Sequence, residues 1–464
     1  MTKAAGLATE SESPVDIKAG RLRPEQYAEN FGDVHPPLDR NSAIVEANRC
    51  LMCHDAPCIQ ACPTSIDIPI FIKKISTDNV KGAATTILSA NIMGGACARV
   101  CPVEELCEQA CVRNTQSGQP IKIGQLQRYA TDHLFQRNDA QIFKRKPATG
   151  KKIAIVGAGP AGLSCAHKLA QEGHSIVIFE ARAKAGGLNE YGIAAYKVTN
   201  DFAQKEVDYI LSIGGIEIRH GQALGKQVTL AQLRKDYDAV FLGMGLTGVN
   251  ALGLEAEDLK GVENAVDYIE SLRQSSDPGR LPVGRRIVVI GGGNTAIDIA
   301  VQVKRLGAED VTLVYRRGQE SMSATEWERE FAQNNDVRIK LWAQPKKLIG
   351  HRGHVTGIEF EYTQLDAGDK LMGTGDTFTI PADMVFKAIG QTFVATPLQD
   401  NGRDILQLTK KGRLAVNEDG QTSLPGVWAG GDCIEGQDLT VSAVEGGKRA
   451  AIAIDRALKE KKNG

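Results

Sequence analysis

The hydrophobic and polar positions of this chain follow three successive patterns. Residues 1–40 carry proline and charge with little periodicity, which predicts an extended arm lying over another part of the protein. Residues 41–145 place apolar side chains at helical spacing and predict a small α-helical domain. From Lys151 onward, short apolar runs alternate with amphipathic helical stretches, which is the order expected of an α/β fold.

The helical segment has candidate caps and one well-defined apolar face. Ser42 and Asp78 are the expected N-caps of two of its helices. In the stretch IKIGQLQRYATDHLF, the apolar residues that fall on one helical face are Ile123, Leu126, Ala130 and Leu134. The pattern predicts short helices that alternate with loops.

Cysteines gather in those loops, where eight of the ten in the chain are found. The stretch RCLMCHDAPCIQACP has the pattern C-x2-C-x4-C-x3-C-P, close to the ferredoxin run whose fourth cysteine serves a neighbouring cluster. A second group contains another Cys-Pro pair. The two groups consist of Cys50, Cys53, Cys58 and Cys62, and of Cys97, Cys101, Cys107 and Cys111. This density of thiols predicts ligands for two iron–sulfur clusters.

Zinc and disulfides are the alternatives for these cysteines. A structural zinc site needs two separated CxxC or Cys/His pairs, whereas this sequence has one CxxC and wider gaps elsewhere. Disulfides require an oxidising compartment, and the polar opening MTKAAGLATESESPVDIKAG lacks the apolar core of a signal peptide. The spacing favours iron–sulfur clusters over both alternatives.

Length and charge set broader limits. A chain of 464 residues is long enough for two or three domains. Its formal net charge of -1 gives no electrostatic footprint for nucleic acid, and no apolar run is long enough to span a membrane. Abundant glycine, at 49 residues, fits α/β domains with tight phosphate-binding turns. We expect a cytoplasmic protein that binds neither nucleic acid nor membrane.

A dinucleotide-binding motif begins at Lys151. The apolar strand KIAIV leads into Gly157-x-Gly159-x-x-Gly162, then an amphipathic helix, then a second strand that ends in Glu180. The glycines permit a tight turn and a close approach of the backbone to a pyrophosphate, and the helix N-terminus favours the anion. The acid lies at the distance expected for a contact with a ribose hydroxyl.

A second motif of this kind begins at Arg285. Three consecutive glycines, Gly291 to Gly293, open a helix after an apolar strand, although Ala296 replaces the usual last glycine. The following strand ends in Tyr315-Arg316-Arg317 where the first motif has an acid, and arginine near the ribose favours NADP(H) over NAD(H). The residues expected to bind this nucleotide are Gly291, Gly293, Asn294, Thr295, Arg316 and Arg317.

The C-terminal two thirds resemble the flavoprotein oxidoreductases with paired FAD and NAD(P)H domains. Besides the two motifs, the resemblance rests on short apolar strands that end near glycine, at residues 239–245, 388–391 and 427–432. It implies two Rossmann-like domains, with the nicotinamide domain inserted into the FAD domain. It also implies that a helix from Thr440 directs its positive end at the flavin. The other residues expected to bind cofactor are Gly157, Gly159, Pro160, Ala161, Gly162, Glu180, Gly187, Leu188, Gly245, Gly390, Gly431 and Asp432.

Disulfide reductases of this architecture have a cysteine pair beside the flavin, and here that pair is missing. Cys165 and Cys433 are the only cysteines after Cys111, and neither has a partner nearby in sequence. Both are expected to be small core residues. Electrons would therefore leave the flavin through the cysteine-rich segment.

With that segment included, the whole chain resembles the N-terminal half of the dihydropyrimidine dehydrogenases and the small subunits of glutamate synthases. Gln127 favours the dehydrogenases, which use glutamine there as a cluster ligand where the synthases usually have glutamate. The resemblance implies one cluster on Cys50, Cys53, Cys58 and Cys111, and another on Cys62, Cys101, Cys107 and Gln127. Counting cysteines alone would instead make Cys97 the eighth ligand.

The expected domain order follows from these motifs. An arm (1–40) precedes a helical domain with two [4Fe-4S] clusters (41–145), the first part of the FAD domain (146–283), the NAD(P)H domain (284–390) and the second part of the FAD domain (391–464).

The resemblance implies an electron-input subunit. It would take hydride from NADPH or NADH onto FAD and pass single electrons through the clusters. The pyrimidine would be reduced on a partner subunit with FMN and further iron–sulfur clusters, in a heterotetramer, because the sequence ends at Gly464 without an FMN barrel. The alternatives are the glutamate synthase small subunit and a zinc-stabilised flavin-binding interaction module. No catalytic side chain is predicted, because hydride transfer needs no protein acid or base.

Overall fold

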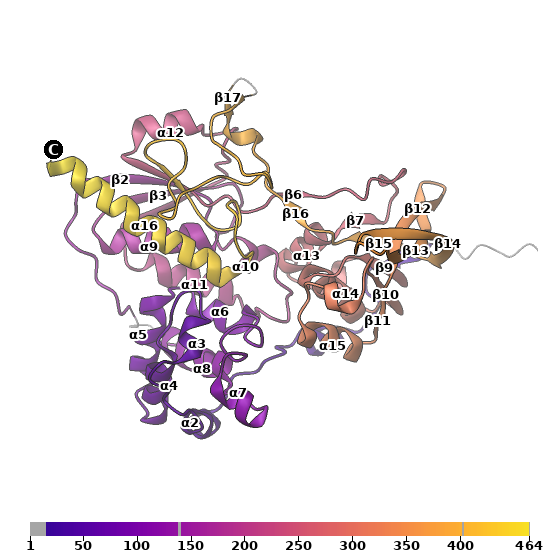
Figure 1. Cartoon of the computed structure of the whole chain (residues 1–464), viewed down its shortest axis with the longest axis horizontal. Coiled ribbons are helices and arrows are strands. Elements are labelled where there is room, and N and C mark those ends of the chain that lie inside the picture. The colour runs from indigo at the N-terminus through magenta and orange to yellow at the C-terminus, as the bar shows by residue number, and fades with distance from the viewer. Residues whose placement is uncertain (1–14, 138–140, 401–402, 464) are drawn as a thin grey trace, which may run out of the picture. The chain divides into compact units, whose positions relative to one another are not determined.

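The computed structural model describes residues 15–137, 141–400 and 403–463 (Figure 1). The chain divides into two compact units. The first, which we call the nucleotide unit, consists of Met1–Asn30 and Ala251–Gly390. The second, the cluster–flavin unit, consists of Phe31–Asn250 and Gln391–Gly464. In the sequence, residues 251–390 of the nucleotide unit therefore interrupt the cluster–flavin unit.

The N-terminal part of the cluster–flavin unit is helical, as predicted. Its helices are α2 (Arg40–Asn48), α3 (Pro57–Gln60), α4 (Ile68–Ser76), α5 (Val80–Ala90), α6 (Gly94–Val100), α7 (Val112–Ser117) and α8 (Ile123–Phe135). On α8 the predicted apolar face is buried, with Leu126, Ala130 and Leu134 fully inaccessible. Helical periodicity alone was sufficient to place this face toward the core.

Both predicted helix caps are wrong, the first by three residues and the second by one. Asp39 caps α2 by accepting a hydrogen bond from the backbone N–H of Ser42, and Ser42 lies inside the helix. Asn79 caps α5 by accepting from Gly82 N, one residue after the predicted Asp78. Several residues near each start have suitable side chains, so the backbone path decides which of them is the cap.

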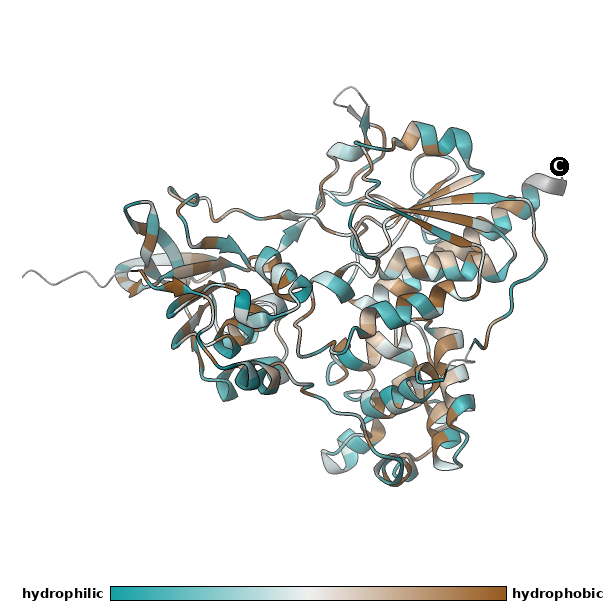
Figure 2. Cartoon of the chain, turned by 180° about the vertical axis from the view of Figure 1, so that it is seen from behind, coloured by the Kyte–Doolittle hydropathy of each residue, from teal (hydrophilic) through white to brown (hydrophobic). Residues whose placement is uncertain are grey.

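A parallel sheet forms the rest of this unit. Among the described residues it has five strands in the order β19-β5-β2-β3-β4, all parallel. Helices α9 and α16 lie side by side against it (Figure 1). Hydrophobic residues concentrate on these strands (Figure 2). The main elements are β2 (Lys152–Val156), α9 (Pro160–Gln171), β3 (Ser175–Glu180), α10 (Leu188–Tyr191), α11 (Phe202–Leu211), β4 (Ile216–His220), α12 (Leu230–Asp236), β5 (Ala239–Leu242), β19 (Val427–Ala429) and α16 (Thr440–Asn463).

Shorter elements connect these. They are β6 (Gly248–Val249), which pairs with β16 (Gln391–Thr392), the 3-10 turn η3 (Thr396–Leu398), and β17 (Gln399–Asp400), which pairs with β18 (Arg403–Asp404). The β6–β16 ribbon lies where the chain leaves the cluster–flavin unit and returns to it.

One hydrophobic core joins the helical segment to the sheet. It includes Ile87 of α5 and Leu126 of α8 together with Ile155 of β2, Leu163 of α9 and Ile454 of α16. Separate domains would each bury their own core and meet at a smaller, more polar interface. The helices with the cysteines and the first dinucleotide-binding fold therefore form a single rigid body.

The nucleotide unit is a second α/β fold. Within its described residues, a parallel five-stranded sheet has the order β11-β10-β9-β15-β7, beside an antiparallel three-stranded sheet β12-β13-β14. Its elements are β1 (Ile17–Lys18), α1 (Pro24–Asn30), β7 (Val262–Asn264), α13 (Ala265–Gln274), η1 (Pro278–Arg280), β8 (Val283–Gly284), β9 (Arg286–Ile290), α14 (Asn294–Arg305), β10 (Asp310–Val314), η2 (Gln319–Ser321), α15 (Glu326–Asn334), β11 (Val337–Lys340), β12 (Ala343–His351), β13 (His354–Leu365), β14 (Leu371–Pro381) and β15 (Met384–Lys387).

The nucleotide unit begins earlier than the predicted residue 284. It includes residues from Ala251, because β7 pairs with β15 as an edge strand of the sheet. The predicted arm also belongs here in part, since β1 pairs with β8 and α1 is a helix rather than extended chain. Residues 1–14 of that arm lie outside the described residues. Pairing between segments that are distant in the sequence determines these boundaries, and no local pattern predicts this pairing.

Gly447 permits the close approach of α16 to α9, and its replacement tests this packing. A Cβ atom at Gly447 would lie 2.0 Å from the carbonyl oxygen of Ala161. We expect Gly447→Ala to lower the free energy of unfolding by about 1–3 kcal/mol through overpacking. Gly436→Ala is the matched control, because a Cβ there meets no atom within 4 Å. Urea unfolding followed by tryptophan fluorescence, including buried Trp428 of β19, measures both. Equal midpoints for the two variants would contradict the expectation.

Candidate functional site

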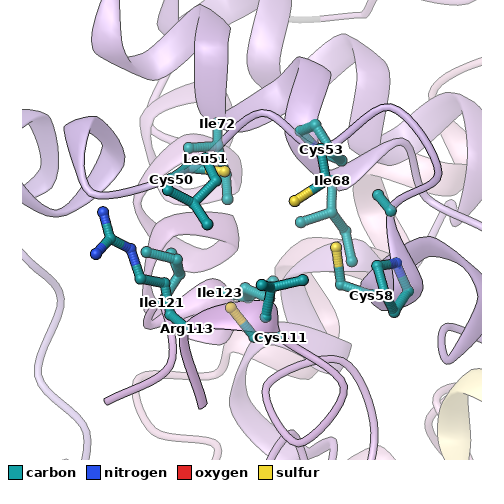
Figure 3. Close-up of a pocket in the computed structure, with 14 residues that line it drawn as sticks. Cys50, Leu51, Cys53, Cys58, Ile68, Ile72, Cys111, Arg113, Ile121 and Ile123 are labelled. Atoms are coloured by element: carbon teal, nitrogen blue, oxygen red, sulfur yellow. The ribbon is translucent and has the colours of Figure 1, made fainter. Parts of the chain in front are cut away.

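Four cysteines from three separate segments line one cavity of the helical region. They are Cys50, Cys53, Cys58 and Cys111. Figure 3 shows the thiols of Cys53, Cys58 and Cys111 directed toward a common space, with Cys50 on the opposite wall. Apolar side chains such as Ile68 and Ile123 complete the lining. This is the same set that the family resemblance assigned to one cluster.

Local backbone structure brings these thiols together. Cys50 follows the last turn of α2, Cys58 lies in the first turn of α3, and Cys111 is the N-cap of α7. The guanidinium of Arg113 donates from Nε to the carbonyl of Arg49 at 3.0 Å, which ties the start of α7 to the end of α2. Cys111 thus joins the first cysteine run although about fifty residues separate them in the sequence.

The surroundings of Cys50 and Cys58 disfavour their thiolate forms in the absence of a metal. Burial, followed by the neighbouring Cys111, raises the pKa of Cys58 to about 12. Burial also raises the pKa of Cys50. Iron binds thiolates, so a metal must displace these protons, and its positive charge supplies the compensation that the apolar walls do not. Within the described residues, no group of three or more Cys, His, Asp or Glu converges closely enough to hold a single metal ion.

A second group of cysteines lies around the end of α6. The neighbouring thiol of Cys97, together with burial, raises the pKa of Cys101. Cys62 and Cys107 are the further thiols that influence Cys101 electrostatically. The structure therefore places Cys97 within this group, where the sequence left two choices for the eighth ligand.

Gln127 is buried on α8 and holds the first residue of α6. Its Nε2 donates to the carbonyl of Gly94 at 2.7 Å. The side chain is only 7% exposed. This bond leaves the amide oxygen as the free end of the side chain, the atom that a metal would take.

The first glycine motif forms the turn between β2 and α9. A Cβ at Gly162 would lie 2.0 Å from the carbonyl oxygen of Gly157, so only glycine allows this helix to start so close to the strand. Gly159 is the N-cap of α9 with Pro160 and Ala161 as its first residues, and a Cβ on Gly159 meets only Gly187 Cα within 4 Å. A helix N-terminus that follows such a turn favours an anion.

The other residues predicted for this cofactor lie at the same carboxyl edge of the sheet. Glu180 ends β3, and its Oε2 accepts from Ala158 N at 2.7 Å, which fixes the acid beside the glycine turn. Gly187 and Leu188 begin α10, Gly245 follows β5, and Gly431 and Asp432 follow β19. A Cβ on Gly431 would lie 2.8 Å from that of Ala161, so this loop contacts the start of α9.

The sequence analysis missed Asn189 on α10. It is 1% exposed, and its Oδ1 accepts a hydrogen bond from the hydroxyl of Thr440 at 2.9 Å. The bond fixes the start of α16, the helix expected to direct its N-terminus at the flavin. A polar residue directly after Gly187-Leu188 was the available signal.

The second glycine motif lies between β9 and α14 in the nucleotide unit. Gly293 is the N-cap of α14, and Asn294 and Thr295 form its first turn. Arg316 and Arg317 follow β10, where Arg316 is exposed and Arg317 half-buried. Gly390 ends the unit just after β15. All six predicted nucleotide contacts thus lie at the carboxyl ends of neighbouring parallel strands, the edge where dinucleotides bind.

A loop after β10 covers this motif and was not predicted. Ala324 donates its backbone N–H to the carbonyl of Gly292 at 3.0 Å, and the hydroxyl of Tyr315 donates to Ser321 at 2.6 Å. A Cβ on Gly293 would lie 3.1 Å from the hydroxyl of Ser323. The sequence of this loop, GQESMSAT, contains no strong motif, so only the fold revealed the position of the loop.

Comparison with known families identifies the fold. Residues 151–447 match the profile of a family described as pyridine nucleotide-disulphide oxidoreductase. The chain belongs to this family. Residues 27–139 of this oxidoreductase match a second profile, dihydropyrimidine dehydrogenase domain II, 4Fe-4S cluster. The predicted fold class is thereby confirmed, with flavoprotein, nicotinamide-nucleotide and 4Fe-4S features in one chain.

Two kinds of relative match nearly the whole oxidoreductase. A chain named glutamate synthase [NADPH] small chain, from Escherichia coli strain K12, is 33% identical and covers 91% of this chain and 93% of its own length. A chain named NAD-dependent dihydropyrimidine dehydrogenase subunit PreT, from Salmonella typhimurium, is 36% identical and covers 90% and 95%. The resemblance of the chain to these two groups of proteins, inferred from its sequence, is confirmed.

Solved structures show the same fold at low identity. Mycobacterium tuberculosis FprA in complex with NADPH superposes with a TM-score of 0.57 at 20% identity, covering 69% of this chain and 86% of its own. Thioredoxin reductase from T. acidophilum gives 0.52 at 22% identity, covering 67% and 99%. Among the described residues, no helix is long and apolar enough to cross a membrane.

Asp432 makes the stability of this oxidoreductase dependent on pH. Burial, with a smaller contribution from Asp438, raises the pKa of Asp432 from 3.8 to about 6. A raised carboxyl pKa gives stability that is full below about 3.8 and lost as the pH rises through 6. Through this group we expect the wild type to lose about 1–2 kcal/mol of its free energy of unfolding between pH 5 and pH 7.5. Asp432→Asn should not show this loss. Urea unfolding at the two pH values measures this. Parallel losses in wild type and variant would show that Asp432 does not carry the effect.

Proposed function

We propose that this chain is the electron-input subunit of an NAD(P)-dependent dihydropyrimidine dehydrogenase in the cytoplasm. In this assignment it oxidises NADPH or NADH and delivers single electrons to a partner that reduces uracil or thymine. The observation that carries the proposal is the common core of the cysteine-rich helices and the first dinucleotide fold. Electron transfer needs donor and acceptor groups at a short and constant separation, and a common core maintains one.

The residues around the first glycine turn suit FAD. The N-terminus of α9 would hold the pyrophosphate, and Glu180 would accept from a ribose hydroxyl. Gly431 and Asp432 would bind the ribityl chain between the pyrophosphate and the flavin ring, and α16 would direct its positive end at the ring. Bound there, FAD supplies the exchange between two-electron hydride chemistry and one-electron transfer.

Two groups of ligands suit two [4Fe-4S] clusters. The first is the cavity with Cys50, Cys53, Cys58 and Cys111, whose apolar walls exclude water from a cluster. The second is assigned to Cys62, Cys101, Cys107 and Gln127, with Cys97 as a neighbouring thiol. The bond from Gln127 to Gly94 orients the amide oxygen for this role.

The second glycine turn suits the nicotinamide nucleotide. The N-terminus of α14 would receive its pyrophosphate, and Arg316 and Arg317 would contact the phosphate on the adenosine ribose of NADPH. Neither guanidinium forms an ion pair in the described part of the chain, so both are available to a phosphate.

The partner would contain FMN and further iron–sulfur clusters, in a heterotetramer. The name of the PreT relatives, which calls them subunits, supports a partner. Gln127 favours this assignment over that of a glutamate synthase small subunit, the second candidate function. The synthase remains the second candidate because the 33% identical relative matches over nearly equal lengths. Iron analysis separates both from a zinc-stabilised module.

Anaerobic titration of the purified chain with NADPH and with NADH tests the proposal. We expect the flavin absorption to bleach and iron–sulfur signals to appear by electron paramagnetic resonance. Arg316→Ala with Arg317→Ala should raise the NADPH concentration required by about tenfold or more and leave NADH unaffected, because each lost phosphate contact weakens binding by about 1–3 kcal/mol. Arg280→Ala, an exposed arginine of the same unit, is the control. Flavin bleaching without any cluster signal would refute the electron-input role.

The choice between Gln127 and Cys97 as eighth ligand leads to a separate prediction. If Gln127 binds iron, Gln127→Ala lowers the iron content by up to four atoms per chain and changes the spectrum of one cluster, whereas Cys97→Ser leaves both unchanged. Cys165→Ser, a buried cysteine on α9, is the matched control. Iron loss in Cys97→Ser with full iron in Gln127→Ala would reverse the assignment. Pyrimidine-dependent NADPH oxidation with the co-purified partner then distinguishes the dehydrogenase from the synthase.

A further inference from the structure

A buried carboxylate on α11, in the first dinucleotide-binding fold, binds the first turn of helix α6. Glu206 lies on α11 and is fully inaccessible to solvent. Its Oε1 accepts hydrogen bonds from the backbone N–H of Gly95 at 3.0 Å and of Ala96 at 2.9 Å. A side chain distant in sequence thus satisfies donors that a helix normally leaves without partners in its first turn. The anion also lies at the positive end of that helix.

Helix α6 leads directly into the second group of cysteines. Cys97 lies on it, and Cys101 is its C-cap. The carbonyl of Gly94, in the same first turn, accepts from Gln127 at 2.7 Å. Glu206 therefore accepts from two backbone N–H groups of this turn, and Gln127 donates to one of its carbonyl oxygens. A shift of α6 would displace both Cys101 and the carbonyl that Gln127 binds, so Glu206 helps to fix α6 relative to Gln127.

The nearby guanidinium of Arg99 is paired with another carboxylate, that of Asp132. Arg99 of α6 donates from Nη2 to both oxygens of Asp132, at 2.7 and 2.9 Å, and from Nη1 to the carbonyl of Gly95 at 3.0 Å. Its guanidinium lies 3.5 Å from the centre of the Phe202 ring. The second oxygen of Glu206 accepts no hydrogen bond from the described residues. The charge of Glu206 is therefore only partly compensated.

A neutral side chain would satisfy the same two N–H groups. Glutamine has the same length and an amide oxygen that accepts two hydrogen bonds, without the cost of burying a charge. Burial raises the pKa of Glu206 to about 7. Above that pKa the acid adds a negative charge that capping does not require, at the start of the helix that leads to Cys101.

We propose that Glu206 is a positioning residue that fixes α6 and, through its charge, lowers the reduction potential of the cluster assigned to Cys62, Cys101, Cys107 and Gln127. The inference rests on the proposed function, since it requires that cluster. A negative charge disfavours the added electron, so the carboxylate stabilises the oxidised cluster. The reduced cluster would then pass its electron on more readily.

Glu206→Gln separates charge from capping, because the amide keeps both hydrogen bonds. Chemical redox titration of the full chain at pH 8.5, followed by electron paramagnetic resonance, measures the potential of each cluster without NADPH. We expect the second cluster to be reduced at a more positive potential in the variant. At a fixed ambient potential its reduced-to-oxidised ratio should rise about fivefold to tenfold. The signal of the first cluster and the flavin content should stay unchanged. Glu328→Gln, which alters a buried glutamate of the nucleotide unit, is the matched control.

Three outcomes are decisive. An unchanged potential in Glu206→Gln, with both cluster signals present, overturns the inference and leaves the proposed function intact. Absence of cluster signals in the wild type refutes the proposed function itself. If Glu206→Gln loses iron from the second cluster, Glu206→Asp decides, because it keeps the charge. A wild-type potential in Glu206→Asp supports the inference. Loss of the cluster there as well shows that the carboxylate charge does not account for the effect, and overturns the inference.

Discussion

The hydrophobic core common to the cysteine-rich helices and the first parallel sheet is the constraint on which the rest of the structure depends. Ile87 and Leu126 from the helices pack in the same cluster as Ile155 and Leu163 from the dinucleotide fold. Protein interiors are close-packed and transmit small displacements, so the two parts cannot move independently. The cysteine cavity and the glycine turn of β2–α9 are therefore held at one separation. A linker between separate domains would allow that separation to vary.

The helices that pack in this core carry the buried thiols and the buried charges. Apolar walls around the four-cysteine cavity raise the pKa values of Cys50 and Cys58, which makes the cavity unfavourable for these two free thiolates and suited to a metal cluster that supplies positive charge. Glu206, Arg99 and Asp132 form a second set of buried charges around α6. Backbone atoms of α6 bind Glu206 and Arg99, and the guanidinium of Arg99 in turn binds Asp132. Electrostatics in this region thus depends on packing, because desolvation strengthens each of these interactions.

The nucleotide unit follows the same architecture but differs in how its boundaries form. Its sheet includes β7 as an edge strand, and β1 from the beginning of the chain pairs with β8. Within the sheet, Arg286 at the start of β9 forms a salt bridge of 2.8 Å with Asp383, the residue before β15. Segments far apart in the sequence therefore complete the unit. The strand order places Gly291, Gly293 and the arginines after β10 at one edge, where the loop 318–325 covers the motif.

Sequence patterns by themselves determined the fold class, both glycine turns and the apolar face of α8. These features depend on contiguous residues, since glycine spacing and helical or strand periodicity act over a few turns of chain. Tertiary structure alone decided that Asp39 and Asn79 are the caps, that β7 belongs to the nucleotide unit, and that Glu206 holds α6. Each of these depends on contacts chosen among several local alternatives or between segments about a hundred residues apart. Such contacts are selected by the packing of the whole chain, and no local pattern encodes them.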